Sequence, residues 1–126
     1  MNIQIFGLQK CADTRKTQRF FKERGIRFQF VDLKEKGLSK GELHSVTVRV
    51  PLDQLIDRSS ARFVEKGLVH ASLNAAKIET LLLADPLLFR TPIVRNGKEA
   101  TVGYCPEIWT NWQANLEGEM GKRGNG

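Results

Sequence analysis

Residues 3–31 read IQIFGLQKCADTRKTQRFFKERGIRFQFV, and this stretch decides the fold class. The apolar run over residues 3–6 is typical of a buried strand, and the segment from about residue 13 to 24 places its two adjacent phenylalanines on one helical face. Gly25 follows the last basic turn and suits a C-terminal helix cap. A second β-rich run covers residues 28–31. Strand, helix and strand in this order predict a right-handed βαβ unit with a parallel pair.

Cys11 stands between the first strand and the helix. A thiol at this place meets the positive end of the helix dipole, and Lys10 and Arg15 add positive charge nearby, so the thiolate is favoured over the thiol. Free cysteines more often behave as small buried hydrophobes, and this interpretation stays open for Cys11 taken alone. The strand-to-helix position predicts a reactive thiol.

Length and composition bound the organisation of the chain. A chain of 126 residues with 40% hydrophobic content fits one compact domain, expected over residues 1–116, followed by a flexible glycine-rich tail over 117–126. No signal-peptide pattern and no membrane-length apolar run is present, so we expect a cytoplasmic monomer without membrane association. Cys11 and Cys105 lie far apart in sequence, which favours reduced thiols over a disulfide framework.

Positive charge gathers around the first helix. Seven basic residues fall between positions 10 and 27, against two acidic ones, in a chain of net charge +6. Such a surface attracts an anion: a small oxyanion, the carboxylates of glutathione or an acidic protein partner. An ordinary solvated helix face is the alternative. The aromatic residues of this region belong to the core face of the helix, which argues against direct nucleic-acid binding.

The middle of the chain, about residues 35–89, predicts an all-helical insertion. Ser39 and Glu42 have the spacing of a capping box, Pro51 suits the first turn of a second helix, and a third helix is expected to begin near Ser59 or Ser60.

The chain then returns to β structure. An Asn-Gly turn at residues 96–97 joins two β-rich runs, at residues 93–95 and 100–102, and predicts a hairpin. A last helix is expected after Pro106, with Ile108, Trp109 and Trp112 on its inner face.

A Thr-Pro step precedes the first strand of this hairpin. A proline entering a strand cannot donate to the ladder, and a cis Thr91-Pro92 bond would turn the backbone toward the reactive thiol, with a trans proline as the alternative. The element order β-α-β, helical insertion, β-β-α predicts an α/β fold of the thioredoxin-like plan with a four-stranded mixed sheet.

The sequence resembles the arsenate reductase (ArsC) and Spx family. The likeness extends from Ile3 to about Trp112. It is carried by three blocks: GLQKCADTRKT at residues 7–17, the stretch from Leu82 to Val94 that ends in RTPIV, and VGY at residues 102–104.

This resemblance implies that Cys11 is the nucleophile and that Arg15 helps hold the anion or the thiolate. It implies reduction of arsenate, or of a glutathione or glutaredoxin mixed disulfide, with glutathione or glutaredoxin as the electron donor and no bound cofactor. The chain departs from the family's arginine pattern, because Thr91 stands before the proline. The residues expected to bind the substrate or anion are Lys10, Thr14, Arg58, Arg62, Arg90, Thr91 and Pro92.

Three further interpretations stay open. An Spx-like regulator would bind RNA polymerase, but Spx-type members carry a Cys-x-x-Cys pair, and Thr14 stands here in place of the second cysteine. Cys105 is either a resolving thiol or a buried cysteine that packs the last helix. A relative with a decayed active site would serve only as an interaction module. We expect no metal, since a zinc site would need the distant His44 and His70 to meet both cysteines.

Overall fold

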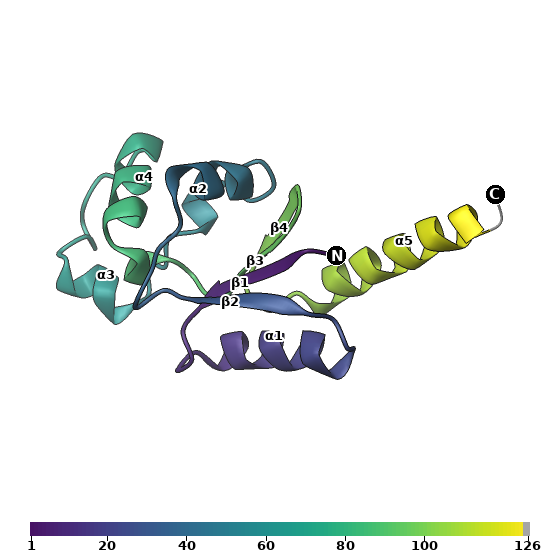
Figure 1. Ribbon diagram of the computed structural model, residues 1–126. Helices are drawn as coiled ribbons and strands as arrows, with labels where there is room; N and C mark the ends of the chain where they lie inside the picture. The colour runs from purple at the N-terminus through teal and green to yellow at the C-terminus, as the bar shows by residue number, and fades with distance from the viewer. Residues whose placement is uncertain (125–126) are drawn as a thin grey trace.

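The computed structural model describes the backbone of residues 1–124 and the side chains of residues 1–116. A small sheet lies between the first helix on one side and a group of short helices on the other (Figure 1). In chain order the elements are β1 (Ile3–Gly7), α1 (Ala12–Glu23), β2 (Phe28–Asp32), α2 (Lys40–Thr47), the 3₁₀ helix η1 (Leu52–Gln54), α3 (Ala61–Glu65), α4 (Ala75–Ala84), the 3₁₀ helix η2 (Pro86–Leu88), β3 (Ile93–Asn96), β4 (Glu99–Val102) and α5 (Pro106–Gly124).

The four strands form one mixed sheet in the order β2-β1-β3-β4. β1 pairs in parallel with β2, whereas β3 runs antiparallel to both β1 and β4. Ile5 at the centre of β1 stands opposite Phe30 on one side and Val94 on the other. The predicted βαβ unit, hairpin and thioredoxin-like four-stranded sheet are therefore confirmed.

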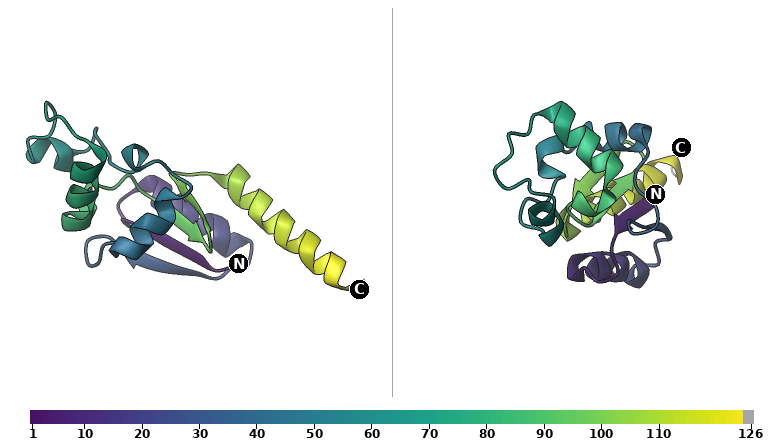
Figure 2. Two further views of the ribbon diagram at one scale, coloured as in Figure 1. Left: turned by 90° about the horizontal axis from the view of Figure 1, so that it is seen from above. Right: turned by 90° about the vertical axis from the view of Figure 1, so that its left-hand side faces the viewer.

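Each face of the sheet has its own core. On one face Phe20 and Phe21 of α1 and Trp109 of α5 pack with Ile5 and Val94 in a fully apolar cluster. The Phe20 and Trp109 ring centroids are 5.3 Å apart at a steep angle, so the aromatic rings join the two helices. The helical insertion covers the opposite face with leucine, isoleucine and phenylalanine side chains. Figure 2 shows α5 leaving this body as a long rod after its first turns.

Local capping rules explain most of the insertion. The Ser39 and Glu42 capping box opens α2, and the Ser60 hydroxyl accepts from the Phe63 amide at the start of α3. The helix expected at Pro51 is only the single 3₁₀ turn η1. It ends early because Ile56 is drawn into an isolated antiparallel bridge with Phe89, which requires extended backbone.

The last helix bears on two expectations. The backbone of residues 117–124, where the sequence predicts a flexible tail, is helical as part of α5, and its flexibility stays a prediction; residues 125–126 lie outside the described part. The residues between the glycines of this stretch, namely glutamate, methionine, lysine and arginine, have high helix propensity and offset part of the cost of the glycines. Ile108 is also 45% exposed, because the inner face of the helix is taken by Trp109. Within residues 1–124, no helix combines the length and apolar character needed to cross a membrane.

Candidate functional site

Cys11 is the N-cap residue of α1. Its backbone is extended, with φ −80° and ψ 121°, and its carbonyl accepts the first helical hydrogen bond from the Arg15 amide at 3.1 Å. The Cys11 amide in turn donates to the Leu8 carbonyl at 2.9 Å, which closes the turn after β1. The thiol therefore occupies the place where a capping side chain accepts from the unpaired amides of the first helical turn.

Thr14 lies directly behind the thiol and is fully buried. A Cβ atom added at Gly7 would stand 2.6 Å from both the Thr14 Oγ1 and Cγ2 atoms, so only glycine at the end of β1 lets α1 approach this closely. The Leu8 amide lies 3.4 Å from Thr14 Oγ1 as a long hydrogen bond. Gly7 is thus a positioning residue that sequence reasoning missed, although a glycine closing the strand before the cysteine could have indicated it.

The Thr91-Pro92 segment forms the second wall of the site. The Thr91-Pro92 peptide bond is cis, as the sequence analysis expected. The Cys11 Sγ lies 3.8 Å from the Thr91 carbonyl oxygen, although the two residues are 80 positions apart. Pro92 itself is buried, and its carbonyl accepts from the Gly103 amide at 2.8 Å, which continues the pairing of β3 with β4. The fold therefore brings Cys11, Thr14, Thr91 and Pro92 together at one end of the sheet.

The surroundings of Cys11 stabilise its thiolate. Burial by itself raises the pKa of the Cys11 thiol, but the polar groups around the sulfur, which are the Thr14 and Thr91 side chains and the Thr14 and Asp13 backbone amides, lower it by more, so that the net pKa lies below its ordinary value. Lys10 and Arg15, which the sequence analysis invoked, are not among the groups that lower it. Dipoles of the helix start and of the two threonines act in their place.

The arginines predicted to surround the substrate have acceptors of their own. Arg15 Nη1 donates to the Gln9 carbonyl at 2.7 Å and so braces the turn that carries Cys11. Arg90 Nη1 donates to the Gln54 carbonyl at 3.3 Å. Lys10 is exposed in the turn. None of these three side chains has a described contact with the Cys11 sulfur, and their part in anion binding stays a prediction.

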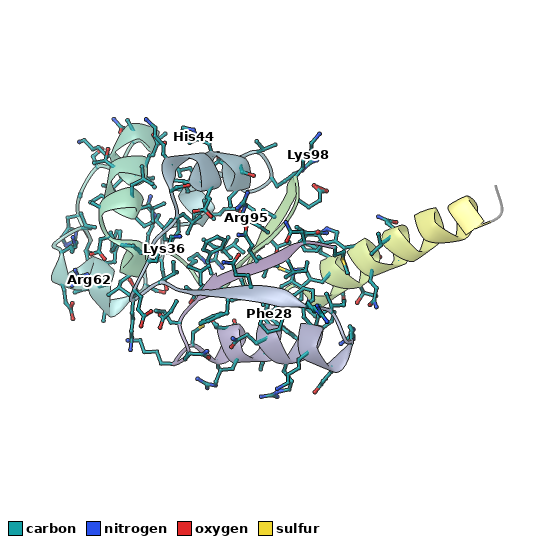
Figure 3. All side chains as sticks on the ribbon, in the orientation of Figure 1. Phe28, Lys36, His44, Arg62, Arg95 and Lys98 are labelled. Atoms are coloured by element: carbon teal, nitrogen blue, oxygen red, sulfur yellow. The ribbon has the colours of Figure 1, made fainter. Side chains whose placement is uncertain are left out.

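The two arginines of the insertion are held by carboxylates. Arg58 pairs with Asp53 at 2.7 Å, and Arg62 pairs with the nearly buried Asp85 at 2.6 Å. Figure 3 shows Arg62 on α3, at the outer edge of the insertion. These ion pairs anchor the short helices of the insertion to one another, and the structure gives neither arginine a contact with Cys11. Their role in substrate binding stays a prediction that these ion pairs do not support.

Cys105 occupies the equivalent capping place on α5, since its carbonyl accepts from the Trp109 amide at 3.2 Å. Its thiol donates to the Val102 carbonyl at 3.4 Å. Burial raises the pKa of the Cys105 thiol, and the Thr101 side chain and the positive charge of Arg90 offset only part of this rise. Both cysteines are free thiols and partly exposed. Its surroundings thus favour the neutral thiol, unlike those of Cys11, and the role of Cys105 as a resolving thiol stays a prediction.

The two histidines are far from this site in the chain. His44 of α2 pairs with Glu79 of α4, and Figure 3 shows it on the outer side of the insertion. Among the side chains of residues 1–116, no three of the types His, Cys, Asp and Glu gather as a metal site would require.

Comparison with known proteins extends over nearly the whole chain. A model of the family described as "ArsC family" matches residues 6–112. The global transcriptional regulator Spx 2 of Oceanobacillus iheyensis is 26% identical, over 92% of this chain and 96% of its own length. Among solved structures, the YFFB protein superposes with a TM-score of 0.78 at 22% identity, over 87% of this chain and 97% of that one. An arsenate reductase (ArsC) related protein from Brucella melitensis gives a TM-score of 0.65 at 26% identity, over 89% and 94%.

Proposed function

The chain belongs to the ArsC family, and from this premise we propose that it is a thiol-dependent oxidoreductase with Cys11 as the nucleophile. The observation that carries the proposal is the position of the thiol at the N-cap of α1, together with its lowered pKa. A thiolate in such a place is the reactive form of cysteine. This geometry also speaks against a decayed site, in which an inert cysteine would need no such support.

The placement of the arginines favours a disulfide over arsenate as the substrate. A tetrahedral oxyanion carries charge on several oxygens and is best held by converging arginine or lysine side chains. Here Arg58 and Arg62 are paired with carboxylates, and Arg15 and Arg90 donate to backbone carbonyls. A disulfide is uncharged at the reacting sulfurs and needs only an activated thiolate and a surface beside it.

In the proposed reaction, the Cys11 thiolate attacks one sulfur of a mixed disulfide between a substrate thiol and glutathione. A bond forms between Cys11 and the glutathione sulfur as the old sulfur–sulfur bond breaks, and the substrate leaves as a thiolate that takes up a proton. A second glutathione, or the thiol of glutaredoxin, then attacks the glutathione sulfur held by Cys11. This step releases the Cys11 thiolate and forms an oxidised disulfide, so the donor thiols are oxidised and the substrate is reduced.

The test measures reduction of a glutathione mixed disulfide, and of arsenate in parallel, with glutathione as donor. We expect the wild-type protein to reduce the mixed disulfide and Cys11→Ser to abolish that turnover. Cys105→Ser should retain it if an external thiol, and not Cys105, regenerates the Cys11 thiolate. Full activity of Cys11→Ser would overturn the assignment. Arsenate turnover faster than mixed-disulfide turnover would overturn the preference for a disulfide substrate.

A second candidate function is an Spx-like regulator that binds RNA polymerase. The likeness to Spx 2 over 92% of the chain supports it, as does the basic first helix. Thr14 in place of a second cysteine excludes a disulfide within residues 11–14 as the sensor. Affinity capture from lysate under reducing and oxidising conditions separates the two candidates: recovery of polymerase subunits by a protein without turnover would favour the regulator.

A further inference from the structure

A basic groove separates α1 from the loop between β4 and α5, apart from the site of Cys11. Its volume is about 450 Å³. One wall comes from α1 and the other from the residues just before and at the start of α5. The residues that define the basic groove are Lys16, Arg19, Phe20, Glu23, Arg24, Tyr104 and Pro106.

The cations of the basic groove are not neutralised. Among the side chains of residues 1–116, Lys16, Arg19 and Arg24 take part in no salt bridge, and Glu23 is the single acidic residue of the groove. The paired arginines of the chain all lie outside α1: Arg49, Arg58, Arg62 and Arg95 each have a carboxylate partner. Three cations and one carboxylate line the groove, so its lining carries a net positive charge.

Aromatic rings lie against two of these three cations, Lys16 and Arg24. The Arg24 guanidinium lies 3.6 Å from the Phe20 ring centroid, and the Lys16 ammonium lies 5.8 Å from that of Tyr104. Lys16 and Arg19 are three positions apart and so share one face of α1. The groove thus presents three positive charges on one helix, two of them beside an aromatic ring.

Exposed apolar surface adjoins the charges. Tyr104 is 41% exposed and Ile108 is 45% exposed, and both line a second hollow of about 330 Å³. This hollow shares Tyr104 and Pro106 with the basic groove and also contains Glu107, whose carboxylate lies beside the apolar surface. Tyr104 is supported from behind by Trp109, with ring centroids 5.6 Å apart. A rigid apolar patch beside unpaired charges is typical of a protein interface.

We propose that the basic groove and the adjoining patch bind an acidic segment of a partner protein. Its aspartate or glutamate side chains would pair with Lys16, Arg19 and Arg24, and an apolar side chain would pack on Tyr104 and Ile108. A single ring, with Lys16 over its face and Trp109 at its side, is no platform for successive bases, so a nucleic acid fits less well. The inference does not depend on the redox role of Cys11.

The test uses the full chain and a short fluorescent peptide that combines aspartate and glutamate with leucine, followed by fluorescence anisotropy. Lys16→Glu with Arg19→Glu removes two groove charges. Lys22→Glu with Arg27→Glu changes the net charge equally at exposed positions outside the groove and serves as the matched control. We expect the groove variant to bind about tenfold more weakly or worse, and the control to lose no more than about threefold. Tyr104→Ser should weaken binding too, and circular dichroism checks that each variant is folded.

Four outcomes would overturn the inference. Equal losses in the two double variants would mean that only net charge matters. Undiminished binding of the same peptide with asparagine and glutamine would remove the role of charge. Tighter binding of a single-stranded oligonucleotide of equal charge would assign the surface to nucleic acid. Failure of the wild-type protein to bind the acidic peptide at all would exclude acidic segments as the partner. Cys11→Ser should bind the peptide as the wild-type protein does, so the outcome of this test does not depend on the proposed enzymatic function.

Discussion

The hydroxyl of Thr14 gives the sharpest test of how the Cys11 thiolate is held. Thr14→Val removes this hydroxyl from a fully buried position while keeping the branched shape and nearly the same volume. The variant loses a hydrogen bond to the thiolate and the long hydrogen bond from the Leu8 amide, and it keeps the helix start and the Thr91 wall. We therefore expect the thiolate of Cys11 to become less stable and its alkylation to slow.

The size of this effect follows from the hydrogen bond. A hydrogen bond to a charged group contributes about 1.5–3 kcal/mol. Because about 1.4 kcal/mol corresponds to a factor of ten, the ratio of thiolate to thiol falls about ten- to a hundredfold. A thiolate that is harder to form is also more nucleophilic, with a Brønsted slope of about 0.4–0.5. This gain in nucleophilicity offsets nearly half of the decrease in the logarithm of the alkylation rate that the lower thiolate fraction causes. The net alkylation rate should fall about three- to fifteenfold.

The assay follows the alkylation rate with iodoacetamide across a pH series, at values acidic enough that the thiol form dominates in both proteins. Thr17→Val is the matched control: Thr17 is equally buried one turn later on α1, and its hydroxyl donates to the Asp13 carbonyl at 2.7 Å. Thr14→Ser should keep most of the wild-type rate. If Thr14→Val leaves the pH dependence of the alkylation rate unchanged, or if Thr17→Val shifts it by the same amount, the Thr14 hydroxyl does not stabilise the thiolate.

Two further predictions concern stability. Gly7→Ala places a Cβ atom 2.6 Å from Thr14 and should lower the free energy of unfolding by about 1–3 kcal/mol in urea titrations, with Thr14→Ala restoring part of it; additive losses in the double variant would contradict the clash. Burial raises the pKa of Asp85, but Lys66, Arg62 and the Leu87 amide lower it further, to a net value below the ordinary one. The contribution of Asp85 to the free energy of unfolding is therefore complete at pH values above the pKa of this carboxyl in the unfolded chain. It is lost as the pH falls through the lower pKa that the carboxyl has in the folded protein. Asp85→Asn should cost about 1–3 kcal/mol near neutral pH and less in acid, and an equal cost at all pH values would exclude the charge as the cause.

Much of the fold follows from local signals in the sequence. The strand, helix and strand of residues 3–31, the Ser39 and Glu42 capping box and the Asn-Gly hairpin all form as their patterns predict. These signals act over a few residues, through side-chain periodicity, caps and turn preferences, so they can be recognised without a tertiary structure. The place of Cys11 at the start of α1 is of the same kind, because it depends only on where a strand ends and a helix begins.

Only the tertiary structure decided which groups surround that cysteine. Sequence reasoning predicted that the start of the helix would stabilise the thiolate, and the backbone amides of Asp13 and Thr14 agree with this. It named Lys10 and Arg15 as the additional groups, whereas the side chains of Thr14 and Thr91 take that part. Each arginine expected at the site donates to a carboxylate or a backbone carbonyl of the protein. Which acceptor it contacts depends on the distances between segments in the folded chain, and these cannot be obtained from the sequence pattern. The exposure of Ile108 likewise depends on how Trp109 sets the rotation of α5 against the sheet. The hydrogen-bond and ion-pair partners of long side chains depend on tertiary packing, because the candidate acceptors differ in free energy only when the segments that carry them lie side by side.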